Sequence, residues 1–477
     1  MNIGAWSLAV WCSAIMGIDI NTHVTYWDAR CADNASRVLS NGGAGWLSAA
    51  SLLLCQQPAI AIGKSWCNVK SAIPPAPPKV LVSWLSSRFS VFDATNQPTT
   101  IIGSRSILLK PTATQKLILR RWMGGYRWAF NFTIDQMVRA HKEGRKDGIS
   151  YKRNRKTWKT EMVEAAPWIT TIAAHTVYGA MMDAELAYKG HVRRLSHKQS
   201  SSTPRCRRKT QRSFYLLGAA ITKRGLYTRL LGPMKSAEPL PDKPSDSRII
   251  YEAGRWYLRV PVSHDVTKAE NQGRVISLDP GVRTFLTGFS LDGLHKIGHG
   301  SFGRIVSLCH HLDDLMSRTT RVRGAKRHRM RNAQARARIR IRNLVDDFHY
   351  QSIGWLLRNY DVVIFPEGNF TSAVRKASRK VRSKTARSLM TWAFARFRDR
   401  LQHKAIIKGK QVILVDESYT SKTANWTGEV VHNLGSRKTI TSGSITVERD
   451  VNGSLGILLK ALLAQPAAKA VATLTVA

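Results

Sequence analysis

The sequence Val275-Ile276-Ser277-Leu278-Asp279-Pro280-Gly281-Val282-Arg283-Thr284-Phe285-Leu286-Thr287-Gly288-Phe289 contains two apolar runs joined by a Pro-Gly turn, with one aspartate where the first run ends. This pattern predicts two neighbouring strands. The first strand would present the Asp279 carboxylate at the edge of a sheet, where it can bind a metal ion. Taken alone, Asp279 is better explained as an ordinary turn residue before Pro-Gly, so a role in metal binding depends on what the fold brings beside it.

Two later segments supply matching acids. Residues 362–365 form an apolar, β-branched run that leads into Pro366 and Glu367, and Asp450 opens a helical stretch that reaches about Leu463. Each acid has an ordinary alternative, since Glu367 could be a solvated loop residue and Asp450 a helix N-cap. Three acids at the ends of three elements, inside a very basic chain, favour a metal-dependent nuclease.

The order of elements predicts an RNase H-like α/β fold. Residues 275–297 supply three short strands, and a long basic helical segment follows over about 305–359. The remaining elements are expected as a strand at 362–365, a helix at 385–408, a strand at 411–415 and a final helix from near Asp450. This order brings Asp279, Glu367 and Asp450 to one site. Carboxylate oxygens suit Mg²⁺, and two such ions about 4 Å apart would activate water and stabilise the leaving oxygen of a phosphodiester.

The charge of the chain identifies the kind of partner. Its 477 residues include 74 Lys and Arg against 31 Asp and Glu, a formal net charge of +43, so a polyanion is expected to bind. Residues 1–100 contribute +2 and residues 101–477 contribute +41. Nucleic acid is therefore expected on the later part. A ribosomal or chromatin protein would explain the charge, but not the three acids.

A basic run marks the expected nucleic-acid surface. Residues 318–342 contain eleven Lys or Arg, and no acid lies between Leu315 and Val345. A solvated helix face is the alternative, but like charges at helical spacing repel without a counter-anion. The candidates for phosphate binding are Arg321, Arg323, Lys326, Arg327, Arg329 and Arg331. A second cluster, Arg375 to Arg387 with Arg375 and Lys376 as its named candidates, is expected to border the cleavage groove.

Aromatic residues offer a weaker signal. Trp122, Tyr126 and Trp128 could stack on nucleobases, although aromatic residues at helical spacing are more often part of a core.

The chain is long enough to form several domains. Residues 1–100 are expected to be a poorly structured extension, residues 101–110 and 205–265 a small β-barrel, and residues 111–204 a helical lobe with Thr112 or Thr114 as N-cap and a basic loop at 142–159. Residues 266–477 would form the nuclease domain. Six dispersed cysteines favour a reducing compartment.

Four ordered motifs resemble those of the transposon-encoded TnpB nucleases, and most closely their eukaryotic relatives, the Fanzor proteins. They are Leu278 to Arg283, Phe365 to Glu367, Asp416 to Thr423 and Glu448 to Gly453, within the spans Pro111 to Gln136 and Val275 to Leu463. The resemblance implies an RNA-guided DNA endonuclease with a wedge barrel, a helical recognition lobe and a RuvC-like domain.

The resemblance also implies roles and partners. Asp279, Glu367 and Asp450 would be the catalytic acids and the Mg²⁺ ligands. A guide RNA would read double-stranded target DNA by base pairing, while the protein reads a short flanking motif. A monomeric ribonucleoprotein in the nucleus is expected, or in an organelle if the N-terminal extension is a targeting segment.

One departure from the family concerns zinc. Family members carry a zinc ribbon between the Tyr-Thr-Ser-Lys-Thr motif and the last aspartate. Here Ala424 and Thr427 occupy the first pair of cysteine positions, the second pair falls near Ile440 and Gly443, and no cysteine follows Cys309. We therefore expect no zinc in the degenerate insert at about 420–447. The alternative function is a cleavage-impaired RNA-guided DNA-binding protein, but the retained acids favour the enzyme.

Overall fold

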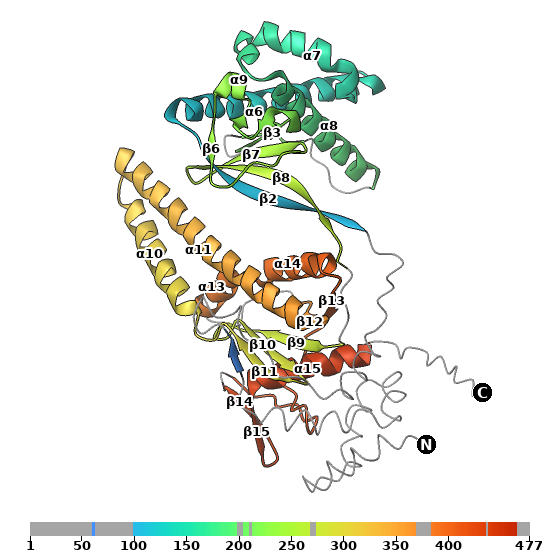
Figure 1. The fold of residues 1–477 in the computed structure, drawn as a ribbon, viewed down its shortest axis with the longest axis vertical. Helices are drawn as coiled ribbons and strands as arrows, with labels where there is room; N and C mark the ends of the chain where they lie inside the picture. Colours follow the sequence, from blue (N-terminus) through green and yellow to red (C-terminus); the bar gives the residue numbers. More distant parts are fainter. Residues whose placement is uncertain are drawn as a thin grey trace, which may run out of the picture. The chain divides into compact units, whose positions relative to one another are not determined.

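The chain is analysed as a computed structural model that describes residues 60–62, 99–197, 204–208, 212–267, 273–368, 383–435 and 437–464. It divides into two compact units (Figure 1). The small unit is Ile101–His264, and the large unit combines Met1–Thr100 with Asp265–Ala477. No helix of the described ranges is both long and apolar enough to cross a membrane.

The large unit is organised around a six-stranded sheet of order β1-β11-β10-β9-β12-β13. Its strands are β1 (Ile60–Ile62), β9 (Val275–Pro280), β10 (Leu286–Ser290), β11 (Gly293–Ile297), β12 (Val362–Pro366) and β13 (Gln411–Val415). Strands β9, β10 and β11 are antiparallel neighbours, and β12 runs parallel to both β9 and β13. The strands predicted from residues 275–297, 362–365 and 411–415 are all present.

One short strand comes from the N-terminal hundred residues. Strand β1 pairs in parallel with β11 at the sheet edge, so the expectation of a poorly structured extension is wrong for Ile60–Ile62. Almost all of the rest of residues 1–100 lies outside the described residues.

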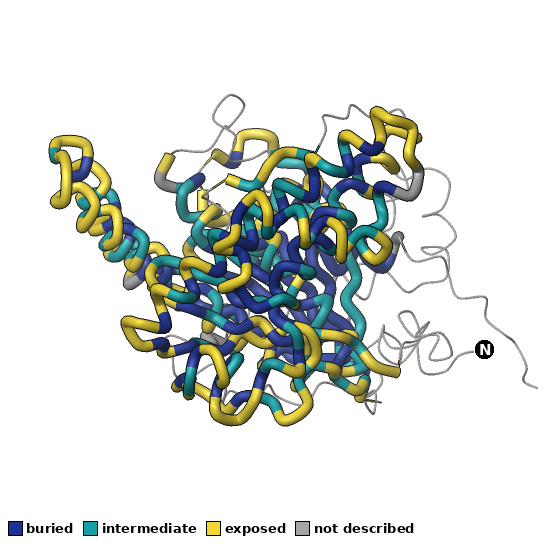
Figure 2. The backbone as a smooth tube through the Cα atoms, turned by 90° about the horizontal axis from the view of Figure 1, so that it is seen from above, coloured by how far each residue is buried: buried dark blue, intermediate teal, exposed yellow. Residues whose placement is uncertain are grey.

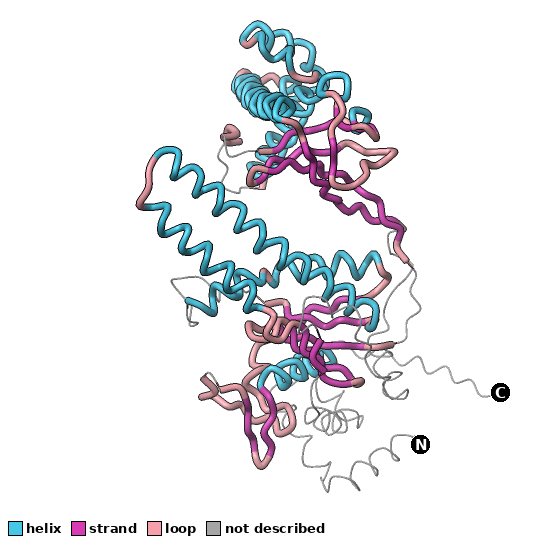
Figure 3. Tube along the Cα trace, turned by 60° about the vertical axis from the view of Figure 1, so that its left-hand side comes forward, coloured by secondary structure: helices cyan, strands magenta, loops and turns pink. Residues whose placement is uncertain are grey.

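Helices cover both faces of this sheet (Figures 1 and 3). Helices α10 (Phe302–Thr320), α11 (Gly324–Asn359), α13 (Ser383–Trp392) and α14 (Phe394–Ile407) share a core with one face, whereas α15 (Arg449–Ala464) packs on the other. Helices α10 and α11 form a long hairpin whose far end is largely exposed (Figure 2).

Two helices that were predicted as continuous are broken. The segment at 305–359 turns near Gly324 (φ +58°), and the segment at 385–408 turns at Ala393 (φ 52°). Both residues adopt the left-handed conformation, which cannot continue a right-handed helix. The hydrophobic pattern of the sequence does not reveal such a turn, because apolar residues recur at helical spacing on both sides of it.

The small unit contains a five-stranded sheet of order β3-β7-β8-β2-β6. Its strands are β2 (Thr100–Lys110), β3 (Ser213–Leu216), β6 (Lys235–Ser236), β7 (Ser247–Glu252) and β8 (Arg255–Asp265). Strands β3 and β6 are its edges within the described part of the chain, and the predicted closure into a barrel is not confirmed. A small hairpin of β4 (Ile221–Thr222) and β5 (Gly225–Leu226) precedes the short helix α9 (Thr228–Leu231).

Helices α6 (Ala113–Lys142), α7 (Tyr151–Ala165) and α8 (Ala174–Ser196) complete the small unit, with the 3₁₀ turns η3 (Lys146–Ile149) and η4 (Pro167–Thr171). Thr112, one of the two predicted N-cap candidates, caps α6 in a reciprocal capping box with Gln115. The prediction of a loop at 142–159 is wrong, because η3 and the first half of α7 occupy most of these residues. Trp158 and Met162, one turn apart, bury the inner face of α7, and its long polar side chains favour a helix.

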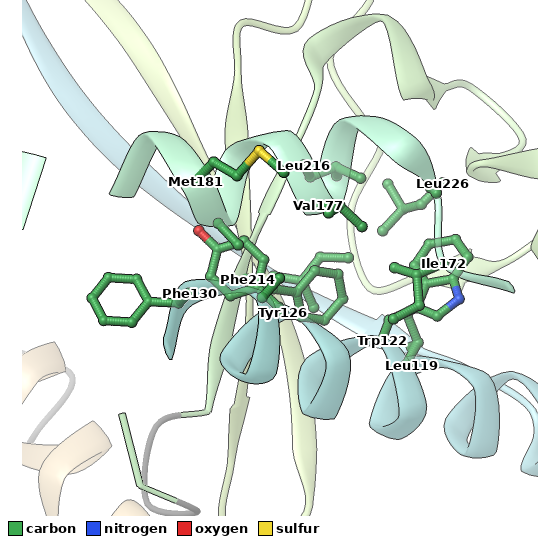
Figure 4. Packing of buried hydrophobic residues seen from close by; sticks show 14 of the residues in the cluster. Leu119, Trp122, Tyr126, Phe130, Ile172, Val177, Met181, Phe214, Leu216 and Leu226 are labelled. Atoms are coloured by element: carbon green, nitrogen blue, oxygen red, sulfur yellow. The ribbon is translucent and has the colours of Figure 1, made fainter. Parts of the chain in front are cut away.

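Trp122 and Tyr126 belong to the core of the small unit (Figure 4). The Tyr126 hydroxyl donates to Asp183 at 2.7 Å, and Asp183 also pairs with Arg207 at 2.9 Å and with Arg248. Burial raises the pKa of Asp183, but its hydrogen bonds with Arg248 and Tyr126 outweigh that effect, and the net shift is downward. One buried carboxylate thus joins α6, α8 and β7.

We predict that Asp183→Ala destabilises the protein by about 3 kcal/mol or more, because it leaves two guanidinium groups without their counter-charge in a partly buried site. Differential scanning calorimetry should show an earlier transition for this variant. Asp135→Ala, at an exposed position of α6, is the matched control and should change little. Equal effects of the two variants would contradict the structural role of Asp183.

Candidate active site

Strand β9 divides its side chains between the two faces of the sheet. Ile276 and Leu278 belong to the core shared with α10, α11 and α14, whereas Val275 belongs to the core shared with α15. Because side chains alternate along a strand, Ser277 and Asp279 also face α15. The Ser277 hydroxyl donates to the carbonyl of Ser454 in α15 at 2.7 Å, and both serines are fully buried.

Helix α15 approaches the end of β9 very closely. A Cβ atom added to Gly453 would lie 2.5 Å from Oδ2 of Asp279, closer than van der Waals contact allows. Only glycine therefore fits at this point of the helix while the Asp279 carboxylate keeps its place. Asp450 lies in the first turn of the same helix.

Asp279 has two acidic neighbours in its electrostatic environment. Burial raises its pKa well above the ordinary value of 3.8, and the negative charges of Asp450 and Glu417 raise it further. The pKa of Asp450 is also raised, chiefly by burial and then by Glu448, and that of Glu417 by burial and then by Asp416. The site thus gathers negative charge that lacks full compensation within the protein.

Basic residues surround this cluster. Arg449 lowers the pKa of both Asp279 and Asp450, and Arg283 and Lys296 act in the same direction on Asp450. Lys296 also pairs with Glu448 at 2.5 Å. Arg283 is exposed on the loop that follows Asp279, where it can meet a phosphate.

Glu367 follows β12 at the same edge of the sheet, but it is not among the described charged residues that shift the pKa of Asp279 or Asp450. Its amide donates to the carbonyl of Val415 at 2.8 Å, Arg398 donates to its carbonyl at 2.6 Å, and the residue is exposed. Since Pro366 pairs with Val415, the acids that follow β12 and β13 lie level with each other. Sequence reasoning selected Glu367 and gave Glu417 no role, although Glu417 also follows a predicted strand.

Within the described ranges, no three acidic, His or Cys side chains converge closely enough to form a complete metal cage. The donor set nevertheless fits magnesium. Mg²⁺ usually binds through one or two carboxylates together with waters and substrate phosphates, and not through an all-protein cage. Asp279 and Asp450 with Glu417 beside them meet that requirement, and their mutual repulsion would be relieved by a divalent cation.

Asn452 ties the loop after β13 to α15. Its fully buried amide donates to the carbonyls of Thr423 (2.7 Å) and Thr420 (3.3 Å), and its oxygen accepts from the backbone and side chain of Asn425 (3.1 and 2.8 Å). The carbonyl of Asn452 accepts from the Asn425 side chain at 2.5 Å. This network holds the segment that carries Glu417 against the helix that carries Asp450.

The insert between Thr423 and Asp450 has an apolar interior. It contains the hairpin β14 (Thr439–Ser442) and β15 (Ile445–Glu448). The positions aligned with zinc ligands are occupied differently: Ala424 and Ile440 are fully buried, and the Thr427 hydroxyl lies 2.6 Å from that of Ser442. Ser442 donates to Glu429 at 2.6 Å, and the Trp426 indole donates to the Ser442 carbonyl at 3.2 Å.

The predicted phosphate-binding residues lie around the end of the α10–α11 hairpin. All six are exposed, namely Arg321, Arg323, Lys326, Arg327, Arg329 and Arg331. They form a basic surface as expected, although their role in binding stays a prediction. Arg375 and Lys376 lie outside the described residues.

Comparison with known proteins gives consistent matches. Residues 394–457 match the family model described as Cas12f1-like, TNB domain, and residues 106–146 match a helix-turn-helix domain model. The first match contains Glu417 and Asp450, and the second contains the whole of α6.

Several curated proteins are similar over most of this chain. A TnpB-like protein of Acanthamoeba polyphaga mimivirus is 24% identical over 402 residues, covering 76% of this chain and 74% of that protein. A putative transposase of Paramecium bursaria Chlorella virus 1 is 23% identical over 415 residues (82% and 94%), and a putative RNA-guided DNA endonuclease of Escherichia coli is 22% identical over 371 residues (73% and 90%).

Among solved structures, the cryo-EM structure of a Cas12f1–sgRNA–target DNA complex is similar with a TM-score of 0.46 and 10% identity, covering 76% of this chain and 99% of that one. The matches to curated proteins and to family models confirm the predicted resemblance to TnpB-like proteins. They do not distinguish the Fanzor proteins within that group.

We predict that Asp279→Asn stabilises the metal-free protein at neutral pH. When folding raises the pKa of an aspartate, the folded state is most stable at low pH, where the carboxyl is protonated. This stability is lost as the pH rises from the ordinary pKa of 3.8 through the raised pKa of the folded state. Asparagine removes that penalty. The midpoint of thermal unfolding in EDTA should rise, by about 2–4 °C for each kcal/mol of repulsion removed.

The stabilisation should shrink as the pH falls, because Asp279 of the wild type then becomes protonated. Asp399→Asn, which removes a charge at an exposed position of α14, serves as the control. A lower midpoint for Asp279→Asn than for the wild type at neutral pH would contradict the repulsive cluster.

Proposed function

We propose that this chain is an RNA-guided DNA endonuclease that cleaves phosphodiester bonds at a RuvC-like, metal-dependent site. The observation that carries the proposal is the acid cluster of Asp279, Asp450 and Glu417, at the end of β9 and against the first turns of α15. The similarity to TnpB-like proteins and to a putative RNA-guided DNA endonuclease supports guidance by RNA. The net charge of +43 supports a nucleic-acid substrate.

The sheet order also supports this interpretation. Three antiparallel strands are followed by a helical hairpin, a parallel strand, further helices, a second parallel strand and a final helix, which is the order predicted for an RNase H-like domain. In such an arrangement the acid at the end of β9 and the acids that follow β13 lie beside the helix that carries Asp450.

Asp279 and Asp450 would hold magnesium, with Glu417 as the third acid in place of the predicted Glu367. When bound, two Mg²⁺ ions supply positive charge at the scissile phosphate and lower the pKa of a water. The protein's own part is to hold the carboxylates in place: Gly453 leaves room for Asp279, and Asn452 fixes the Glu417 segment against α15. Arg283 is placed to bind a phosphate oxygen. The exposed basic end of the α10–α11 hairpin would bind guide and target phosphates.

The function is tested by sequencing the RNA that purifies with the protein and then assaying double-stranded targets complementary to it, each with a randomised flank. The wild type should cut a subset of flanks in Mg²⁺ and none in EDTA. Asp279→Ala and Asp450→Ala should bind the same targets without cutting them. Specific binding by a wild type that cuts no target would instead support the cleavage-impaired alternative, and the absence of any defined RNA would exclude both.

The third acid can be identified by a matched pair of variants. We predict that Glu417→Gln lowers the cleavage rate by about a hundredfold or more, because a metal ligand is lost, whereas Glu367→Gln stays close to wild type. Single-turnover cleavage with saturating guide and Mg²⁺ is the measurement. The reverse ranking would restore Glu367 to the site.

We also propose that the insert at 420–447 folds without zinc, on its apolar interior and the Thr427–Ser442–Glu429 hydrogen bonds. Elemental analysis should find well under one zinc per chain, and a strong zinc chelator should leave the unfolding midpoint unchanged. Stoichiometric zinc, or a midpoint that falls in chelator and recovers with added zinc, would contradict this proposal.

A further inference from the structure

We propose that an aromatic patch on the small unit, formed by Trp128, Phe132 and Trp168, binds the unpaired bases of a single-stranded nucleic acid by stacking. This inference extends the proposed function but rests on separate residues. It concerns a surface of the helices α6 and α7 and of the turn η4, and none of its residues belongs to the candidate active site.

The three rings form one continuous aromatic surface. Trp128 and Phe132 of α6 are stacked, with ring centroids 5.5 Å apart and planes at 30°. Trp168 of η4 meets Trp128 edge-on, also at 5.5 Å. Trp122 and Tyr126 are almost fully buried in the core, but Trp168 remains 38% exposed and Trp128 and Phe132 are only partly buried. Leaving the apolar surface of an indole in contact with water costs free energy.

A pair of glycines shapes this surface. A Cβ atom at Gly125 would lie 1.9 Å from the Ile172 side chain and 3.0 Å from the Trp168 ring, so glycine allows both side chains to settle close to α6. Gly124 is one helical turn before Trp128, and a Cβ there would meet none of the described atoms within 4 Å. The backbone beside the indole is therefore open, and a flat ring can approach Trp128 from that side.

The surroundings favour an anionic polymer over an apolar partner. Helix α7 runs through Ala166 directly into η4, and it carries five basic residues within eight positions, Lys152, Arg153, Arg155, Lys156 and Lys159. Lys152, Arg153, Arg155 and Lys156 are exposed, although the Arg155 and Lys159 side chains lie over the Tyr178 ring of α8. On α6, Arg121 is exposed two turns before Trp128.

Helix α7 lies alongside the part of α6 that carries the patch. Glu161 of α7 accepts a hydrogen bond from Gln136 at 3.0 Å, one turn beyond Phe132. Lys156 is nine residues before the end of α7, or about 14 Å along its axis. A backbone that follows the basic residues of α7 can thus bring its bases to the rings.

Aromatic side chains beside a basic surface are the general means by which proteins bind single strands without sequence preference. A duplex cannot use such a patch in the same way, because its bases are already stacked on each other. The inferred ligand is therefore an unpaired segment, and RNA and DNA share the chemistry that the patch recognises.

The test uses the full-length protein, freed of bound RNA by a high-salt wash, in EDTA so that no cleavage can contribute. Binding of a twelve-nucleotide strand with 2-aminopurine at its centre is followed by the quenching of its fluorescence. Trp168→Leu should weaken binding by about five- to a hundredfold and reduce the quenching, whereas Trp168→Phe should retain most of both. RNA and DNA strands of equal sequence decide which the patch prefers.

Salt dependence separates stacking from charge. Trp168→Leu should leave the slope of log K against log salt unchanged, while Lys156→Ala should reduce it by about 0.7, the value for one phosphate contact of a single strand. Leu186→Ala, at another exposed apolar position of the small unit, is the control and should have no effect. Thermal unfolding of each variant verifies that the small unit remains folded.

The proposal is overturned if Trp168→Leu binds single strands as tightly as the wild type, or if it weakens duplex and single-strand binding equally. Photocrosslinking of a strand containing 4-thiouridine gives a second readout, with adducts expected on the peptides that contain Trp128 or Trp168. These measurements involve no guide and no cleavage. The proposal for the aromatic patch can therefore be rejected while the nuclease proposal stands, and the nuclease proposal can be rejected while the proposal for the patch stands.

Discussion

The close approach of α15 to β9 is the contact on which the large unit depends. Ser277 donates to the Ser454 carbonyl, and Gly453 leaves room for the Asp279 carboxylate where any other residue would displace it. Small residues allow the helix to lie against the sheet, and this proximity places an acid from a strand beside an acid from a helix more than 170 residues later. The electrostatic repulsion in that site is a consequence of the same packing, because burial removes the water that would screen it.

The loop after β13 is held to the same helix by polar contacts. Asn452 makes hydrogen bonds to three residues of the loop, and all are buried within a shell of apolar side chains from the insert. A buried amide that uses both its N–H donors and its oxygen acceptor stabilises the fold, whereas a buried amide with an unsatisfied group destabilises it. The insert can therefore support the position of Asp450 with apolar packing and hydrogen bonds, which supports its proposed folding without metal.

The two units use their charges in different ways. In the small unit, Asp183 is surrounded by Arg207 and Arg248, so a buried acid is neutralised within the protein. In the large unit, Asp279 has acidic neighbours, and the repulsion is left for a ligand to relieve. An acid that is compensated internally stabilises the fold, whereas one that is not is available for chemistry.

The sequence by itself determined five of the six strands of the central sheet, two candidates for the cap of α6, the basic α10–α11 segment, and Asp279 and Asp450 as acids at element ends. These features depend on local periodicity and on residues a few positions apart. Only the tertiary structure brought Glu417 near enough to raise the pKa of Asp279, broke a helix at Ala393, and left Trp128 partly exposed while burying Trp122 and Tyr126. Those outcomes depend on strand register and helix packing between segments far apart in the chain, which no local pattern encodes.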